Sequence, residues 1–118
     1  MKSDNILSCC LEKGMTEEES YEAYKVFFRT FNSEIRIKIM NALREKKLNV
    51  QEISEKTKIE QTTISHNLRR LNHCGFVEKE IKGKYRYYSL NKKTIEPILN
   101  SINKHMSNHC IHIVRGER

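Results

Sequence analysis

The side chains best suited to binding chemistry lie between residues 61 and 93. The first part of this stretch, QTTISHNLRR, holds amide, hydroxyl, imidazole and guanidinium groups, which match the hydrogen-bonding patterns of base edges. Eight Lys and Arg against two Glu give residues 61–93 a net charge of +6, out of +7 for the whole chain. Residues 1–60 hold eleven charges of each sign. A basic surface concentrated in one segment indicates a polyanionic partner such as DNA.

Two short helices are predicted to position these side chains. Asn49 and Glu52 have the spacing of a capping box, which opens a short helix with Ile53 turned inward. Residues 58–60 make a tight turn, and the next helix runs from about Gln61 to His73. Its inward positions are spaced by four and three residues: Ile64, Leu68 and Leu71. Gly75 can take the left-handed conformation that ends a helix. This pattern predicts a helix-turn-helix.

A β-hairpin is predicted directly after the helix-turn-helix. Residues 76–81 and 85–90 are typical of strands, and Lys82-Gly83-Lys84 is the turn between them. Tyr85, Tyr87 and Tyr88 are divided between the two faces by strand alternation, so at least one of them is expected to pack inward. The fold class is therefore mostly α with a β-hairpin wing, a winged helix-turn-helix.

In this geometry the first half of the second helix enters the major groove of DNA. Its outward positions are the predicted DNA contacts: Gln61, Thr62, Thr63, Ser65, His66 and Arg69. Gln61 can read adenine, and Arg69 can read guanine or bind phosphate. Arg70 is interpreted as a solvated neighbour. In the wing, three basic residues are placed for phosphate or minor-groove contact: Lys82, Lys84 and Arg86.

The two ends of the chain carry long apolar stripes. Thr16 with Glu19 forms a capping box that opens a helix with aromatic residues at positions 21, 24, 27, 28 and 31. Ser33 caps the next helix, whose expected buried face is Ile35, Ile39, Met40 and Leu43. A last helix is predicted over residues 94–114. Apolar stripes on both terminal helices favour a homodimer, which would also present two reading helices about one DNA turn apart.

Length and composition bound the remaining classes of function. We expect a single domain over residues 16–118, preceded by a flexible segment over residues 1–15 that carries a cysteine pair. The sequence has no apolar run long enough to span a membrane and no signal-peptide pattern, so a cytoplasmic location without membrane contact is expected. An enzyme is not expected, because the sequence lacks a Cys-x-x-Cys, a phosphate-binding loop and a carboxylate pair.

The sequence resembles the ArsR/SmtB family of repressors over about 60 residues. The resemblance lies in SEIRIKIMNAL, TTISHNLRRL, CGFV and GKYRYYSL. Ser33 stands where the family usually has Asp, and Asn67 where it often has His. The resemblance implies a homodimeric winged-helix repressor that leaves its double-stranded DNA operator when an effector binds.

The metal sites that the family uses most often are not found in this sequence. Asn49 and Gln51 stand where a Cys-x-Cys would bind metal, and residues 90–95 hold neither Asp nor His. His105 and His109 lie four residues apart and could share an ion, but two ligands do not make a sensing site. No cofactor is required for the predicted fold.

The cysteines offer a second kind of effector site. Cys9 and Cys10 can together bind a thiophilic ion such as As(III), or an ion of the Cd, Pb or Zn type. The resemblance implies a third thiol, either Cys74 at the end of the second helix or Cys110 on the last helix. Two alternatives stay open: control by oxidation of Cys9 or Cys10 with Cys110, and a winged-helix regulator with no small-molecule effector.

Overall fold

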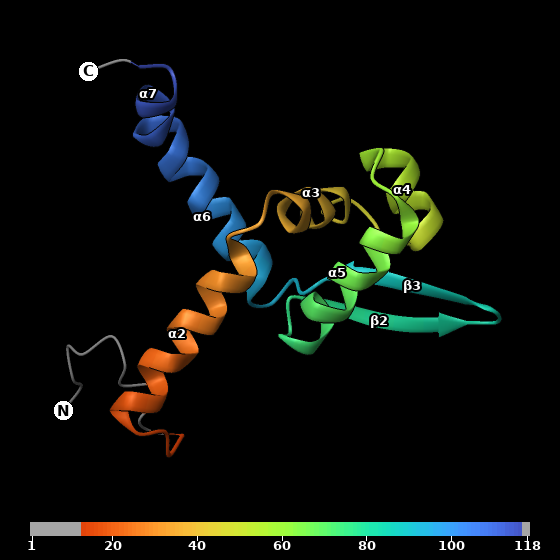
Figure 1. The fold of residues 1–118 in the computed structure, drawn as a ribbon, viewed down its shortest axis with the longest axis horizontal. Coiled ribbons are helices and arrows are strands. Elements are labelled where there is room, and N and C mark those ends of the chain that lie inside the picture. The colour runs from red at the N-terminus through yellow and green to blue at the C-terminus, as the bar shows by residue number, and fades with distance from the viewer. Residues whose placement is uncertain (1–12, 117–118) are drawn as a thin grey trace.

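The protein is mostly helical, with a small antiparallel sheet (Figure 1). The structure, a computed structural model, describes residues 13–116. The elements follow in chain order: α2 (Glu17–Phe31), α3 (Glu34–Ala42), β1 (Leu48–Asn49), α4 (Val50–Thr57), α5 (Gln61–His73), β2 (Val77–Lys82), β3 (Tyr85–Leu90), α6 (Ile95–Asn108) and α7 (Cys110–Val114). This arrangement confirms the predicted helix-turn-helix and hairpin.

Side-chain caps start three of the helices at the predicted positions. The Thr16 hydroxyl accepts from Glu19 N at 3.1 Å, and the Glu19 carboxylate accepts from Thr16 N at 2.9 Å. Asn49 and Glu52 form the same reciprocal pair at α4. Ser33 caps α3 by accepting from the backbone N–H three residues later. These bonds satisfy backbone donors that a helix start otherwise leaves unpaired.

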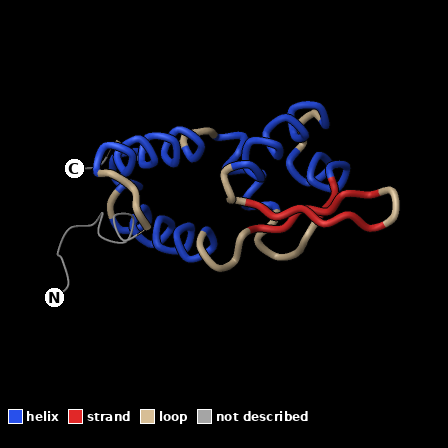
Figure 2. The backbone as a smooth tube through the Cα atoms, turned by 90° about the horizontal axis from the view of Figure 1, so that it is seen from below, coloured by secondary structure: helices blue, strands red, loops and turns tan. Residues whose placement is uncertain are grey.

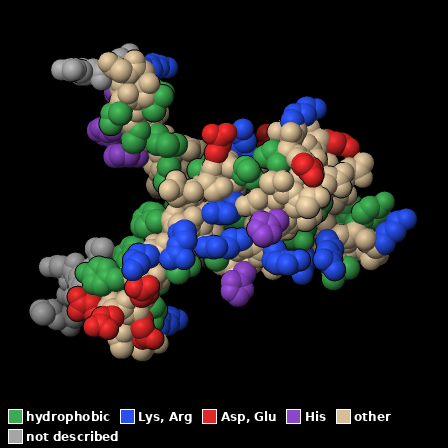
Figure 3. All heavy atoms as spheres, in the orientation of Figure 1, with side chains coloured by type: hydrophobic (Ala, Val, Ile, Leu, Met, Phe, Trp, Pro, Cys, Tyr) green, Lys and Arg blue, Asp and Glu red, His purple; other side chains and the backbone are tan. Residues whose placement is uncertain are grey.

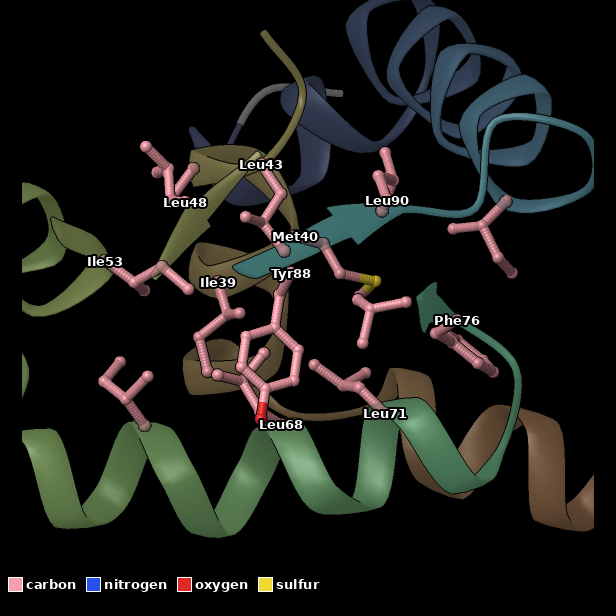
Figure 4. Close-up of a cluster of buried hydrophobic side chains, with 14 of the residues drawn as sticks. Ile39, Met40, Leu43, Leu48, Ile53, Leu68, Leu71, Phe76, Tyr88 and Leu90 are labelled. Atoms are coloured by element: carbon pink, nitrogen blue, oxygen red, sulfur yellow. The ribbon is translucent and has the colours of Figure 1, made fainter. Parts of the chain in front are cut away.

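The core lies between α3, α4, α5 and the sheet (Figure 4). Ile39 and Met40 of α3 point toward Leu68 and Leu71 of α5, and all four are fully buried. The predicted inward positions of α5 are confirmed. The prediction for α3 is wrong at Ile35, which lies in the first turn of the helix and is 37% exposed. A first turn that extends past the core leaves its apolar residue in contact with solvent.

The sheet has three strands rather than the predicted two. β3 is central, with β2 on one side and the short β1 on the other. Leu48 of β1 pairs with Tyr88, and Val77 of β2 pairs with Leu90. Tyr88 is the inward-facing tyrosine, with 8% of its surface exposed. The hairpin of β2 and β3, residues 77–90, is the wing; β2 begins and ends one residue later than predicted.

The terminal helices extend away from the core on the side opposite the wing (Figures 1 and 2). One helix was predicted over residues 94–114, whereas the structure has two, separated at His109, whose φ of −128° and ψ of −66° are not helical. Asn108 and His109 have low helix propensity, which favours a break there. In the described part of the chain, none of the helices combines the length and the apolar character needed to span a membrane.

Candidate nucleic-acid interface

The turn between α4 and α5 is held by side chain to backbone hydrogen bonds. α4 ends at Lys58, which takes a left-handed φ of 64° although it is not a glycine. The Ser54 hydroxyl donates to the Ile59 carbonyl at 2.5 Å, and the Ile59 N–H donates to the Thr57 hydroxyl at 3.3 Å. These bonds, together with the burial of Ile53, fix where α5 starts relative to α4.

α5 presents one row of exposed polar residues along its length. Five of the six predicted contacts are exposed: Gln61, Thr62, Ser65, His66 and Arg69. His73, in the last turn, is also exposed and extends the row. Thr63 is half-buried, and it lies four residues before Asn67, on the face of α5 that meets Arg36 of α3. His73 follows Arg69 by four residues and therefore lies on the same face of the helix.

The hairpin register places the basic residues of the wing on different faces. Arg86 is paired with Ile81 and shares the core side of the hairpin with Tyr88, beyond the end of the core. Lys82 is paired with Tyr85 on the opposite face. Lys84, in the turn, lies with its Nζ 5.7 Å from the Tyr85 ring centroid. All three basic residues are exposed, so the wing offers positive charge on both of its faces.

A glutamate in the wing offsets part of this charge. Glu80 accepts from Lys47 Nζ at 3.0 Å and lies 3.5 Å from Lys82 Nζ. The hydrogen bond from Lys47 lowers the pKa of the Glu80 carboxyl, and the same bond raises the pKa of Lys47. The carboxylate is therefore ionised at neutral pH. Lys47 directly precedes β1 and reaches the wing because β1 pairs with β3, a pairing that the sequence pattern did not reveal.

The exposed row of α5 and the wing belong to one basic surface (Figure 3). Lys and Arg side chains, with histidines between them, follow this face of the molecule from the region of α2 to the wing, whereas acidic side chains gather at the far end of α2 and over α3 and α4. The first turn of α2 holds three acidic residues: Glu17, Glu18 and Glu19. Basic side chains of α5 and of the wing therefore lie on the same face of the molecule.

The neighbouring Arg70 does not belong to the exposed row. Its Nε and Nη2 donate to the Thr30 hydroxyl of α2 at 3.3 and 3.2 Å, and the side chain is half-buried. The interpretation of Arg70 as a solvated residue is therefore wrong. The helical period explains the difference, because adjacent residues are about 100° apart around the helix.

The cysteines and histidines do not form a metal site within the described residues. Cys9 and Cys10 lie outside these residues. Cys74 is half-buried at the end of α5, with its Sγ 3.5 Å from the Thr30 hydroxyl, and Cys110 begins α7. The His105 and His109 rings lie 4.7 Å apart. Among residues 13–116, three or more His, Cys, Asp or Glu side chains do not come together as ligands for one ion.

The helix-turn-helix, the wing and the basic surface together define a winged-helix, DNA-binding class of protein. A sequence model described as "Bacterial regulatory protein, arsR family" matches residues 33–79. The chain is 31% identical to the transcriptional repressor SdpR of Bacillus subtilis over 81 residues, which are 65% of this chain and 90% of SdpR. It therefore belongs to the arsR family of bacterial regulatory proteins.

Two further proteins are similar to this chain. The arsenical resistance operon repressor of Bacillus subtilis is 28% identical over 85 residues, 71% of this chain and 81% of the repressor. The homodimeric winged helix-turn-helix DNA-binding domain Mb0332 of Mycobacterium bovis has a structure that matches with a TM-score of 0.72, 20% identity and 95% coverage of both chains. At that identity the second comparison shows the fold alone.

Proposed function

We propose that this chain is a homodimeric transcriptional repressor that binds a double-stranded DNA operator with α5 and the wing of each subunit. The observation that carries the proposal is the continuous exposed surface of α5 and the wing. Gln61, Thr62, Ser65 and Arg69 are exposed on α5 and would contact base edges and phosphates in the major groove. The exposed Lys82, Lys84 and Arg86 would extend the contact along the DNA backbone or into the minor groove.

Exposed apolar residues on the terminal helices support the dimer. Tyr21 and Phe28 of α2 are 54% and 59% exposed, and Ile113 and Val114 of α7 are 77% and 80% exposed. A cleft of about 750 Å³ lies between α2, α3 and α6, lined by Phe28, Ile102 and Met106 among others. Solvent contact of this extent is unfavourable, and a second subunit would relieve it. The similar Mycobacterium bovis domain is described as homodimeric.

Selection from a random duplex library followed by fluorescence anisotropy tests the DNA-binding part of the proposal. The selected duplex should contain an inverted repeat, because a symmetric dimer reads two equal half-sites. Lys84→Ala should lower the affinity for all duplexes and reduce the log–log salt slope by about 1 per subunit. Lys25→Ala, which removes an exposed lysine of α2 that is paired with Glu22, is the matched control. A protein that binds all duplexes equally would contradict the proposal.

We further propose that a thiophilic ion bound by cysteines releases the repressor from DNA. The likeness to an arsenical resistance repressor and the four thiols of the chain support this effector class. Cys9 and Cys10 are the proposed pair, with Cys74 or Cys110 as the third ligand. An ion drawn to Cys74 would break its contact with Thr30 at the end of α5. The ion would release DNA only if it binds the DNA-free conformation more tightly.

Titration of the reduced protein with arsenite and with Cd(II) tests the effector. Thiolate-to-ion absorption and release of the selected duplex should saturate together at one ion per subunit, and Cys9→Ser should abolish both. Comparison of Cys74→Ser with Cys110→Ser identifies the third ligand. Release by a mild oxidant but not by either ion would instead support oxidation as the signal. DNA binding that responds to none of these treatments would contradict a thiol-based effector.

A further inference from the structure

A network of polar side chains joins the end of α2 to α5. Its members, here called the α2–α5 network, are Thr30, Arg36, Asn67, Arg70 and Cys74. Thr30 is fully buried and Asn67 is 8% exposed. Buried polar groups are costly unless they are paired, so this network needs an explanation beyond filling space.

Arg36 is the centre of the network. Its Nε donates to the Thr30 carbonyl at 2.7 Å, and its Nη2 donates to the Arg29 carbonyl at 3.0 Å. The last carbonyls of a helix lack partners within the helix, so this guanidinium closes the end of α2. Its Nη1 donates to Asn67 Oδ1 at 3.1 Å. The planar guanidinium of one α3 side chain therefore bonds to both α2 and α5.

Asn67 links Arg36 to the first turns of α5 through the two ends of its side-chain amide. While Oδ1 accepts from Arg36, Nδ2 donates to the Thr63 carbonyl at 2.8 Å. Both halves of the amide are thus engaged, and its orientation is defined by its partners. Thr63 lies between Thr62 and Ser65, which belong to the exposed row. The contact with Arg36 therefore acts on the part of α5 that carries the proposed base contacts.

The rest of the network attaches the second half of α5 to the same turn of α2. Arg70 donates to the Thr30 hydroxyl, which also contacts Cys74 Sγ. Asn67, Arg70 and Cys74 are three and four residues apart and so share one face of α5. The core and the exposed row occupy the other faces. α2 is also the helix that presents Phe28 for subunit contact, so the network lies between the proposed dimer interface and α5.

We propose that Arg36 and Asn67 are positioning residues that hold α5 at a fixed angle to α2, and thereby set the distance between the two copies of α5 in the dimer. This inference rests on the proposed function. Neither side chain needs to touch DNA. Their effect is on which half-site spacing the dimer accepts, because that spacing follows from the distance between the two reading helices.

Binding to duplexes with altered half-site spacing tests the inference. The wild-type protein, Arg36→Lys and Asn67→Leu are compared on the duplex selected by the wild type, on versions lengthened or shortened by single base pairs between half-sites, and on a single half-site. Asn72→Leu is the matched control. Asn72 lies on the same helix and also donates to a backbone carbonyl, that of Val77, but it faces β2 and not α2. Circular dichroism checks that each variant is folded.

We expect the wild type to prefer one spacing sharply. Arg36→Lys and Asn67→Leu should lose about tenfold or more in affinity at that spacing, the loss typical of one charge-assisted hydrogen bond, while half-site affinity changes little and the spacing preference flattens. Asn72→Leu should keep the wild-type spacing profile. An unchanged profile in folded Arg36→Lys would overturn the inference and leave the network a purely structural one. A wild type that binds no duplex, or shows no spacing preference, would overturn the proposed function as well.

Discussion

Arg69 and Arg70 are neighbours in the chain with opposite surroundings. Arg69 is exposed beside Ser65 and His66, whereas Arg70 is half-buried against Thr30 of α2. The guanidinium of Arg69 is therefore free to meet a base edge or a phosphate, and that of Arg70 is engaged in holding two helices together. Identical side chains thus have different roles that depend on which face of α5 they occupy.

Replacement of Arg69 by Ala should weaken operator binding by about 1–3 kcal/mol, as expected for the loss of one good contact to DNA. If Arg69 reads a base, specificity at one base pair should relax; if it binds phosphate, the salt slope should fall by about 1 per subunit. Anisotropy titrations at several salt concentrations separate the two roles. His73→Ala, on the same exposed row but in the last turn, should bind as the wild type does. Unchanged binding by Arg69→Ala would show that the major-groove assignment is wrong.

The positive charge that the wing can offer to DNA phosphates is smaller than its number of Lys and Arg residues indicates. Glu80 pairs with Lys82 of the wing and with Lys47, so part of the positive charge of the wing is already offset. The pKa of Glu80 is lowered by the bond from Lys47, and the contribution of this pair to stability is therefore present above the ordinary carboxyl pKa. That contribution is lost only as the pH falls through the lowered pKa. The offset of charge consequently operates at neutral pH.

Glu80→Gln should tighten DNA binding and steepen the log–log salt slope by about 1 per subunit, because Lys82 and Lys47 become available to phosphates. The effect should persist between pH 6 and pH 8. Carboxyl groups titrate roughly two pH units lower, so Glu80 stays ionised throughout this range. Glu78→Gln, two residues earlier on the same face of β2, is the control for a simple change of net charge. Equal gains in both variants would contradict a specific role for the Lys47–Glu80–Lys82 cluster.

The whole molecule is less compact than a globular domain of the same length. Its radius of gyration is 16.7 Å, against about 13.5 Å expected for a compact domain of this size. Figures 1 and 2 show the cause, since α2 and the α6–α7 pair diverge from the core and from each other. Several of their apolar residues line the cleft or face solvent. A second subunit seated on these helices would complete the burial that one chain leaves unfinished.

Phe28→Ala should shift the monomer–dimer equilibrium toward the monomer by about 2 kcal/mol, the usual effect of removing an aromatic anchor from an interface. Stability of the winged-helix core should change less, because Phe28 is 59% exposed within one subunit. Sedimentation velocity over a concentration series measures the shift. Tyr85→Ala, which removes an exposed aromatic from the wing, should leave the equilibrium unchanged. A Phe28→Ala protein that remains dimeric at all concentrations would place the subunit interface elsewhere.

Local signals predicted most of the elements. The break at His109 was missed although its cause is local, whereas three other misses share a long-range cause. The caps at Thr16 and Asn49 and the inward row of α5 depend on residues at most seven positions apart, and all are confirmed. β1, the exposure of Ile35 and the burial of Arg70 were missed. Each depends on parts of the chain that are distant in sequence. β1 forms by pairing with β3, Ile35 is exposed because the core ends before it, and Arg70 is half-buried against α2. Periodicity identifies a helix face but not its neighbour.

By itself, the sequence determined the order of elements, the family and the concentration of positive charge on α5 and the wing, because these follow from residue type and short-range spacing. The tertiary structure alone decided which polar residues face solvent and which join helices. It separated Arg69 from Arg70, gave Glu80 a lysine partner from outside the hairpin, Lys47, and engaged Asn67 with Arg36. The physical reason is that a hydrogen bond requires two groups within about 3 Å in a suitable direction, and only the folded chain brings residues 30, 36, 67 and 70 to that distance.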